Sequence, residues 1–271
     1  MSEFEALLEE GASAPVEGWD FSWFEGRATE ERPPWGYAEL LAERYRTAGS
    51  ALDVQTGGGE VVAWALRRAS QRASQRADRT AGRAPSPLAA TESWEPNVAL
   101  ATRALAPFGG TVAHVADEDP LPFGDAAFDL VSARHPVVAV WPEIARVLRP
   151  GGTYLAQHVG VGSAHEVTEA MLGPTPVGQG RHPDTAAADA RAAGLEVRDL
   201  REVKLRMEFL DVAAVAVFLR KVIWIVPGFT VAAYREQLRA LHERIQAEGP
   251  FVAHSTRYLI ECRKPHRSDS G

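Results

Sequence analysis

Apolar stretches of strand length alternate with amphipathic stretches along most of this chain of 271 residues. Strands are predicted at 50–55, 88–92, 111–116, 128–135, 153–159 and 255–264, with a further strand after Gly194. Helices are predicted at 60–71, 96–107, 140–152, 211–224 and 230–249, with a further helix before Gly194. Parallel strands need crossover connections, which are usually helices, so this alternation predicts an α/β fold. We expect a seven-stranded, mostly parallel sheet with helices on both faces and an N-terminal helical cap.

The pattern divides the chain into a short N-terminal segment and one large domain. We expect residues 1–47 to form a cap or lid, residues 48–264 the main domain and residues 265–271 a disordered tail. Residues 67–87 form an insert with six arginines and one aspartate, ending in Gly and Pro. Such an insert suits either a nucleic-acid-binding arm or a helix that runs into solvent and is followed by a linker. We favour the second interpretation.

Charge and cysteine content exclude several classes of protein. The formal net charge of −7 argues against a nucleic-acid partner, because nucleic-acid binders usually present clustered positive charge. Cys262 is the only cysteine, which excludes an internal disulfide framework and a cysteine zinc cluster, and we expect no metal. The acidic N-terminus is no signal peptide, and no apolar run reaches the ~18 residues of a membrane helix. We expect a cytoplasmic protein without a membrane partner; a homodimer stays open.

A glycine-rich turn, "DVQTGGGE" at 53–60, follows the first predicted strand. Glycines there let the backbone touch a ligand at the carboxyl end of the sheet. The dinucleotide motif G-x-G-x-x-G fails, because counting from Gly57 and Gly59 places Val62 at the third glycine. A phosphate-binding P-loop fails because no lysine follows. Asp53 could meet an ammonium group, and the backbone N–H groups of the turn could meet a carboxylate. This arrangement suits a zwitterionic amino-acid group better than a pyrophosphate.

Four motifs, in this order, resemble those of the class I S-adenosylmethionine-dependent methyltransferases, in their small-molecule, type-11-like branch. They are "DVQTGGGE", then "ATESWEPN", then "VADEDPLPFGDAAFDLV", and finally "EIARVLRPGGTYL". The resemblance covers roughly residues 48–160, and both ends of the chain resemble uncharacterised bacterial members of the family. It implies a Rossmann-like fold, with S-adenosyl-L-methionine as cofactor and S-adenosyl-L-homocysteine as product.

The resemblance also implies roles for single residues. Asp53 and the backbone of residues 55–59 would hold the methionine end of the cofactor, and Glu92 would accept hydrogen bonds from both ribose hydroxyls. Asp117 would meet the adenine amino group, with Glu118 beside it, and Trp94 would pack on the adenine face. The full cofactor-binding set is Asp53, Gln55, Thr56, Gly57, Gly59, Glu92, Ser93, Trp94, Asp117, Glu118 and Arg134. The alternative for Glu92 is a solvated acid at a strand end.

Two departures from the family pattern concern Gln55 and Glu92. Gln55 stands at the first glycine position, where a positive φ would cost roughly a kcal/mol or more. Without that φ, its amide could instead meet the methionine carboxylate. Glu92 lies 39 residues after Asp53 (92 − 53), whereas the ribose acid usually follows the turn by about 20. The insert at 67–87 explains the excess, because a surface insertion costs little.

The acceptor site is predicted from histidines and aromatic residues. His135 and His158 end the fourth and fifth predicted strands, where either could act as a general base or only hydrogen-bond the acceptor or a loop. An aromatic-rich segment at 19–37 suits either a lid that excludes water or a segment packed on the sheet. The substrate and lid residues are Trp19, Phe21, Trp23, Trp35, Tyr37 and Trp224. For Trp224 a buried core position is the alternative.

We expect a methyltransferase that acts on a small-molecule acceptor. The Arg/Ala-rich composition is associated with enzymes of secondary metabolism, so we expect the acceptor to belong there. The Asn/Asp-Pro-Pro-aromatic signature of nucleic-acid amino methyltransferases is absent after the fourth strand, where "ARHPVV" stands. Three alternatives stay open. They are an RNA methyltransferase, a non-catalytic protein that binds S-adenosylmethionine, and an enzyme that uses the sulfonium only as a charge for decarboxylation or hydroxylation.

Overall fold

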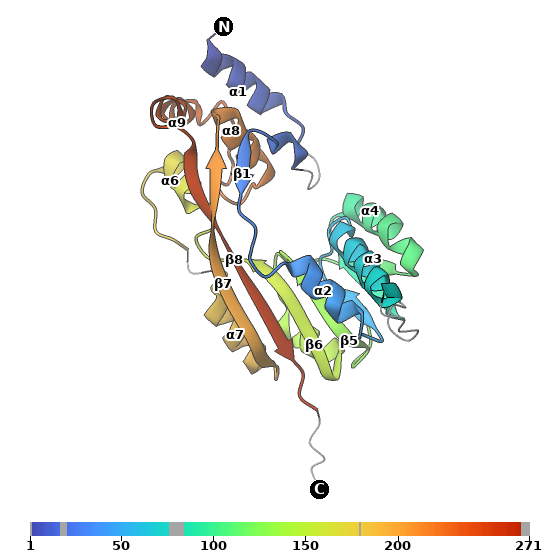
Figure 1. The fold of residues 1–271 in the computed structure, drawn as a ribbon. Coiled ribbons are helices and arrows are strands. Elements are labelled where there is room, and N and C mark those ends of the chain that lie inside the picture. Colours follow the sequence, from blue (N-terminus) through green and yellow to red (C-terminus); the bar gives the residue numbers. More distant parts are fainter. Residues whose placement is uncertain (1, 17–20, 76–83, 179, 267–271) are drawn as a thin grey trace. The chain divides into compact units, whose positions relative to one another are not determined.

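The computed structural model describes residues 2–16, 21–75, 84–178 and 180–266. Its strands are β1 (Ala28–Glu30), β2 (Ala51–Asp53), β3 (Leu88–Glu92), β4 (Thr111–His114), β5 (Phe128–Arg134), β6 (Leu148–Val159), β7 (Glu196–Phe209) and β8 (Phe251–Arg263). They form one sheet in the order β1-β7-β8-β6-β5-β2-β3-β4 (Figure 1). The strands β2 to β6 pair in parallel, which confirms the α/β class. The sheet has one strand more than expected, because β1 pairs antiparallel with β7.

The chain packs into two compact units, each built from separate stretches of sequence. The first contains Met1–Arg32, Gly160–Gly180 and Val203–Arg257, and the second contains Pro33–Val159, Arg181–Glu202 and Tyr258–Gly271. The strands β7 and β8 therefore contribute residues to both units. The division of the chain at residue 47 stays a prediction.

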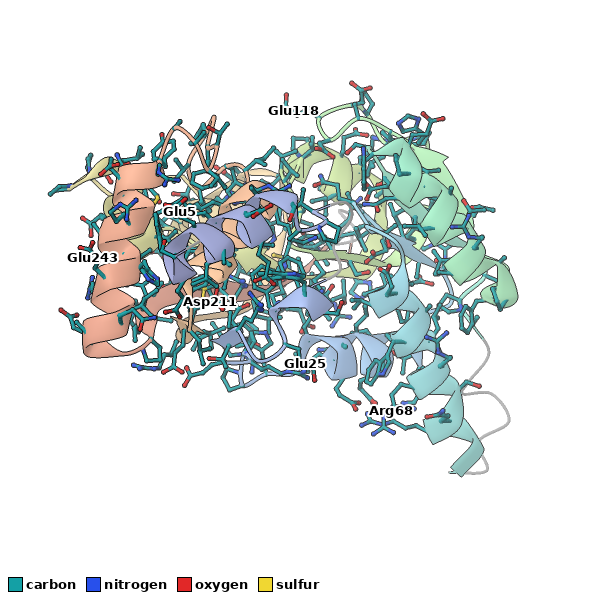
Figure 2. All side chains as sticks on the ribbon, turned by 90° about the horizontal axis from the view of Figure 1, so that it is seen from above. Glu5, Glu25, Arg68, Glu118, Asp211 and Glu243 are labelled. Carbon is teal, nitrogen blue, oxygen red and sulfur yellow. The ribbon has the colours of Figure 1, made fainter. Side chains whose placement is uncertain are left out.

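The second unit holds the parallel strands and the helices that connect them. These helices are α2 (Tyr37–Tyr45), α3 (Glu60–Gln75), α4 (Glu95–Leu105), the 3-10 turn η2 (Ala106–Phe108), α5 (Trp141–Val147) and α7 (Pro183–Ala192). Figure 1 shows α2 and α3 on one face of the sheet and α7 on the other. Arg68 of α3, labelled in Figure 2, pairs with Glu39 of α2 at 3.1 Å. The part of the insert at 76–83 lies outside the described residues.

The core of the second unit lies between the sheet and the helices α5 and α7. Trp141 of α5 meets Tyr154 of β6 edge to face, with 5.3 Å between ring centroids. Small residues of α7, Ala187 and Ala190, allow that helix to pack closely on the same cluster. The burial of these side chains holds the parallel strands in register, so their carboxyl ends form one edge.

The first unit has a separate helical core. Its helices are α1 (Glu3–Ser13), the 3-10 turn η1 (Ser22–Phe24), α6 (His165–Leu172), α8 (Val212–Lys221) and α9 (Arg235–Glu248). Asp211, labelled in Figure 2, begins α8 by accepting a hydrogen bond from the Ala214 amide at 2.8 Å. Gly11 lets α1 approach α8 closely, since a Cβ there would lie 3.0 Å from the Cβ of Ala216. No helix in the described ranges is long and apolar enough to cross a membrane.

Helix α5 is shorter than the sequence pattern predicts. It ends at Val147, and Leu148 already pairs with Phe128 as the first residue of β6. The register then shifts, so that Thr153 pairs with Leu130, and Gly151 adopts a φ of +79° within this irregularity. The stretch "RPGG" is therefore a distortion inside a strand, which its Pro and Gly residues allow.

Candidate functional site

The strand order reverses at β2, and this places the candidate site. The chain passes from β2 to β3 and β4 on one side, then returns to β5 and β6 on the other. Ligands of open α/β sheets bind outside the carboxyl ends of the strands at such a point. A small cleft that opens to solvent lies there. Its lining includes Gln55, Thr91, Asp117, Val138 and Ile144.

The glycine turn after β2 needs its glycines for two different reasons. Gly57 and Gly59 both lie in the left-handed region, at φ +64° and +78°. A Cβ on Gly59 would lie 3.1 Å from the Cα of Ala101, so Gly59 also lets the start of α3 pack on α4. A Cβ on Gly57 would meet nothing within 4 Å. The backbone at Gly57 is therefore open on the side where a side chain would stand, which suits contact with a ligand.

Gln55 does adopt a positive φ, of +55°. Its side-chain amide does not point away from the protein: Nε2 donates to the Val138 carbonyl at 2.8 Å, and Oε1 accepts from the Val137 amide at 2.5 Å. The strain of about 1–2 kcal/mol is thus offset by two hydrogen bonds of about 0.5–1.5 kcal/mol each. Glutamine at this position joins the glycine turn to the loop after β5. The sequence departure has a structural reason.

Glu92 ends β3 as a buried carboxylate with only 7% of its surface exposed. One oxygen accepts from the Gly57 amide at 2.8 Å and the other from the Trp94 amide at 3.0 Å. Glu92 therefore holds the glycine turn against the turn after β3. It is not the solvated acid of the alternative interpretation.

Asp53, at the end of β2, is a second buried acid at the carboxyl ends of the strands, with 4% of its surface exposed. Burial raises its pKa to about 6, against a hydrogen bond from Ser132 that lowers it. The Ser132 hydroxyl donates this bond at 2.5 Å from β5. The carboxyl group of Asp53 thus titrates close to the physiological range.

The remaining predicted cofactor residues lie at different depths. Asp117 lines the cleft, whereas Glu118 is exposed and points outward from its loop (Figure 2). Trp94 begins α4 with 45% of its surface exposed, and Ser93 accepts from the His114 ring at 2.8 Å through its carbonyl. The Thr56 amide donates to the Thr91 carbonyl at 2.9 Å, and Arg134 is exposed at the end of β5. Their roles toward a cofactor stay predictions.

His135 lies just after β5, at a positive φ of +57°. Its amide donates to the Gln157 carbonyl at 2.7 Å, and its Nε2 lies 2.8 Å from Gln157 Nε2. Trp35 donates from its indole to Gln157 Oε1 at 2.7 Å. Gln157 was not predicted as a site residue. The one signal for it is a polar residue in the apolar strand "TYLAQHV".

His158 faces the opposite side of the sheet from Gln157, since side chains alternate along a strand. It stacks on Tyr258 with 4.7 Å between ring centroids, and its Nε2 lies 3.3 Å from the Tyr154 hydroxyl. Burial lowers the pKa of His158 to about 3. A histidine that stays neutral in this way packs the core, and this geometry does not favour a general base.

The predicted lid residues divide between the two units. Trp19 lies outside the described residues. Phe21, Trp23 and Trp224 belong to the first unit, where Phe21 and Trp224 are 43% and 44% exposed. Trp35 and Tyr37 belong to the second unit and are buried. The lid role stays a prediction.

Comparison with known proteins agrees with the fold and the strand-end motifs. Residues 52–156 match the type-11 family model described as a methyltransferase domain. A candidate methyltransferase from Bacillus halodurans is 17% identical over 84% of this chain and 98% of its own, with a TM-score of 0.54. The YcgJ protein of Bacillus subtilis is also 17% identical, over 85% and 98%, with a TM-score of 0.55. A functionally unknown protein from Deinococcus radiodurans is 13% identical over 96% and 98%, with a TM-score of 0.55.

No curated protein sequence matches the chain. At these identities the solved structures support the fold alone, and the similarity to the family is confined to residues 52–156. That segment runs from β2 to β6 and includes the glycine turn, Glu92 and the loop of Asp117. This segment is therefore similar to the class I methyltransferase domains of the type-11 branch, a family that uses S-adenosylmethionine.

Proposed function

We propose that this protein transfers a methyl group from S-adenosylmethionine to a small-molecule acceptor. The observation that carries the proposal is Glu92, a carboxylate buried at the end of β3 and bonded to the backbone of the glycine turn. A buried acid at this place offers fixed acceptors for ligand hydroxyls. The net charge of −7 supports a small acceptor over RNA.

The residues of the cleft suit this cofactor. A carboxylate has about four acceptor sites, so Glu92 can keep its bonds to Gly57 and Trp94 and still accept two ribose hydroxyls. The open backbone at Gly57 and the acid Asp53 suit a zwitterionic methionine end. Asp117 lines the cleft where the adenine amino group would lie. When bound, the cofactor supplies an electrophilic methyl group on a sulfonium.

The protein's own part in such a transfer is alignment and exclusion of water. A methyl group on sulfonium is already electrophilic, so the acceptor atom needs to be held in line with it. Gln55 fixes the loop after β5 to the glycine turn, so both walls of the cleft keep their places. A base is required only for an acceptor that arrives protonated.

Two measurements test the proposal. Calorimetry should show binding of S-adenosylhomocysteine and none of NAD, because the turn lacks the third glycine of the dinucleotide motif. Incubation with cofactor labelled in its methyl group and a cell extract should then place label in the small-molecule fraction. Equal affinity for NAD would contradict the cofactor assignment. Label confined to RNA would contradict the acceptor class, and binding without any transfer would indicate a non-catalytic protein.

A further inference from the structure

A chain of three hydrogen-bonded side chains runs from the buried Trp35 and Gln157 to the partly buried His135. The Trp35 indole nitrogen lies 2.7 Å from Gln157 Oε1, and Gln157 Nε2 lies 2.8 Å from His135 Nε2. Trp35 and Gln157 are only 9% and 4% exposed. These side chains lie outside the four motifs of the family resemblance.

The chemistry of the three groups fixes where each proton lies. An indole nitrogen can only donate, so the atom of Gln157 that faces Trp35 is its oxygen. The amide NH₂ of Gln157 then faces His135, and Nε2 of His135 must accept its hydrogen bond. A proton on His135 Nε2 would bring two donors together. A flipped Gln157 amide would place its NH₂ group against the indole N–H of Trp35, which again brings two donors together.

The backbone around this chain keeps the three groups in place. His135 donates its amide to the Gln157 carbonyl at 2.7 Å, so Gln157 binds it through both main chain and side chain. The Tyr37 hydroxyl donates to the Ala133 carbonyl at 3.0 Å, which ties the segment of Trp35 to the strand of His135. His135 is also held at a positive φ, a conformation that persists only where surrounding contacts impose it.

We propose that Trp35 and Gln157 are positioning residues that hold His135 in one neutral tautomer, with the proton on Nδ1. In this tautomer Nδ1 carries the proton and the lone pair of Nε2 is engaged by Gln157. Neither nitrogen can then take a proton from an acceptor, so His135 is not a general base in the proposed methyl transfer. The acceptor class that fits is one whose reacting atom has a lone pair without losing a proton, such as a carboxylate or a neutral aromatic nitrogen. The conclusions on the base and on the acceptor class rest on the proposed function, whereas the tautomer does not.

Nuclear magnetic resonance of the full chain with ¹⁵N-labelled histidine tests the tautomer directly, because protonated and unprotonated ring nitrogens have distinct signals. His135→Asn identifies the signals of His135, and asparagine tolerates the positive φ. In the wild type the Nδ1–H form should outnumber the Nε2–H form by at least tenfold. Gln157→Glu should reverse this and protonate Nε2, since a carboxylate only accepts.

Matched variants separate the hydrogen bonds from packing. Gln157→Met keeps a similar volume without the amide, and Trp35→Phe keeps a ring without the N–H, so each should give a mixture of tautomers. Binding of S-adenosylhomocysteine shows which variants are folded. One folded variant, either Gln157→Met or Trp35→Phe, is enough for the tautomer test. A wild-type His135 protonated on Nε2 would overturn the proposal, as would a tenfold preference that survives in the folded variants. With an identified acceptor, a hundredfold loss of kcat in a folded His135→Asn protein would overturn the conclusion on the base. If S-adenosylhomocysteine does not bind, circular dichroism reports folding and the tautomer measurement still decides.

Discussion

The carboxyl edge of the parallel strands has an acidic half and a neutral half. At β2 and β3, Asp53 and Glu92 are buried carboxyl groups bonded by a hydroxyl and by backbone amides. At β5 and β6, His135 and His158 lie against an amide, a phenol and a stacked ring instead. The acidic half can hold a cation and ligand hydroxyls, whereas the neutral half keeps its protons in place. These contacts favour binding and alignment, rather than proton transfer, as the part of this edge in the proposed function.

The largest expected effect comes from the neutral half. The folded state disfavours protonation of His158, so its contribution to stability is present above about pH 6.5 and is lost as the pH falls toward about 3. The whole loss amounts to about 5 kcal/mol, and about 2–3 kcal/mol of it falls between pH 6.5 and 4.5. His158→Phe keeps a ring against Tyr258 and should remove this acid sensitivity.

Urea unfolding at pH 7.5 and 4.5 measures the effect of His158→Phe. The exposed His266 offers a control, because His266→Phe should leave the pH dependence of the wild type unchanged. If His158→Phe loses as much stability in acid as the wild type, His158 is protonated in the folded protein and this half of the edge is not neutral.

Glu92 tests whether the acidic half binds the cofactor. Glu92→Ala should weaken binding of S-adenosylhomocysteine by about 2–4 kcal/mol, thirtyfold or more, because two charge-assisted hydrogen bonds are lost. Calorimetry measures the affinity, and Glu95→Ala is a control three residues further along the chain, since Glu95 is exposed and lies outside the predicted cofactor-binding set. Equal losses in both variants would mean that charge alone, not the position of Glu92, matters.

Asp53 should show the opposite pH dependence to His158. Its raised pKa means that its contribution to stability is complete below about pH 3.8 and is lost as the pH rises through about 6. Asp53→Asn does not titrate, so it should gain about 3 kcal/mol relative to the wild type between pH 3.8 and 7.5. Urea unfolding across this range is the measurement, with the exposed Asp189→Asn as control. Parallel curves for wild type and Asp53→Asn would show that the carboxyl group is solvated.

The smallest expected effect concerns Gln55, which joins the two halves. Gln55→Ala and Gln55→Gly both lose the bonds to Val137 and Val138, but only glycine relaxes at a φ of +55°. The glycine variant should therefore be the more stable of the two by about 1 kcal/mol. Thermal unfolding of the pair measures this difference. An alanine variant as stable as the glycine variant would mean that the turn at residue 55 changes its φ.

The acidic half could be predicted from sequence because its contacts are local to two strand ends. Asp53, the glycine turn and Glu92 follow strands that periodicity detects, and parallel strands bring their ends together. The bounds of β3 agree with the prediction at both ends, whereas α2 was predicted only as part of an N-terminal helical cap without bounds, and α6 was not predicted. Short helices within Gly- and Pro-rich surroundings leave little periodic signal.

The neutral half could not be predicted in the same way. Its key bond joins residues 122 positions apart, and a single glutamine in a strand says nothing about which indole it will meet. The role of Gln55 also depends on a distant loop, 82 and 83 residues further along the chain. Such contacts result from tertiary packing, and local pattern does not encode them.

The alternation of the two units along the chain has a consequence for biosynthesis. Residues of β8 enter the core of the first unit through Phe251 and Ala253, and the core of the second through Tyr258 and Ile260. Neither core is complete until β8 has left the ribosome, so the nascent chain exposes apolar surface until then. A stop codon placed before β8 would remove a strand from both cores at once, and the shortened product would be a substrate for chaperones and proteases rather than a smaller folded protein.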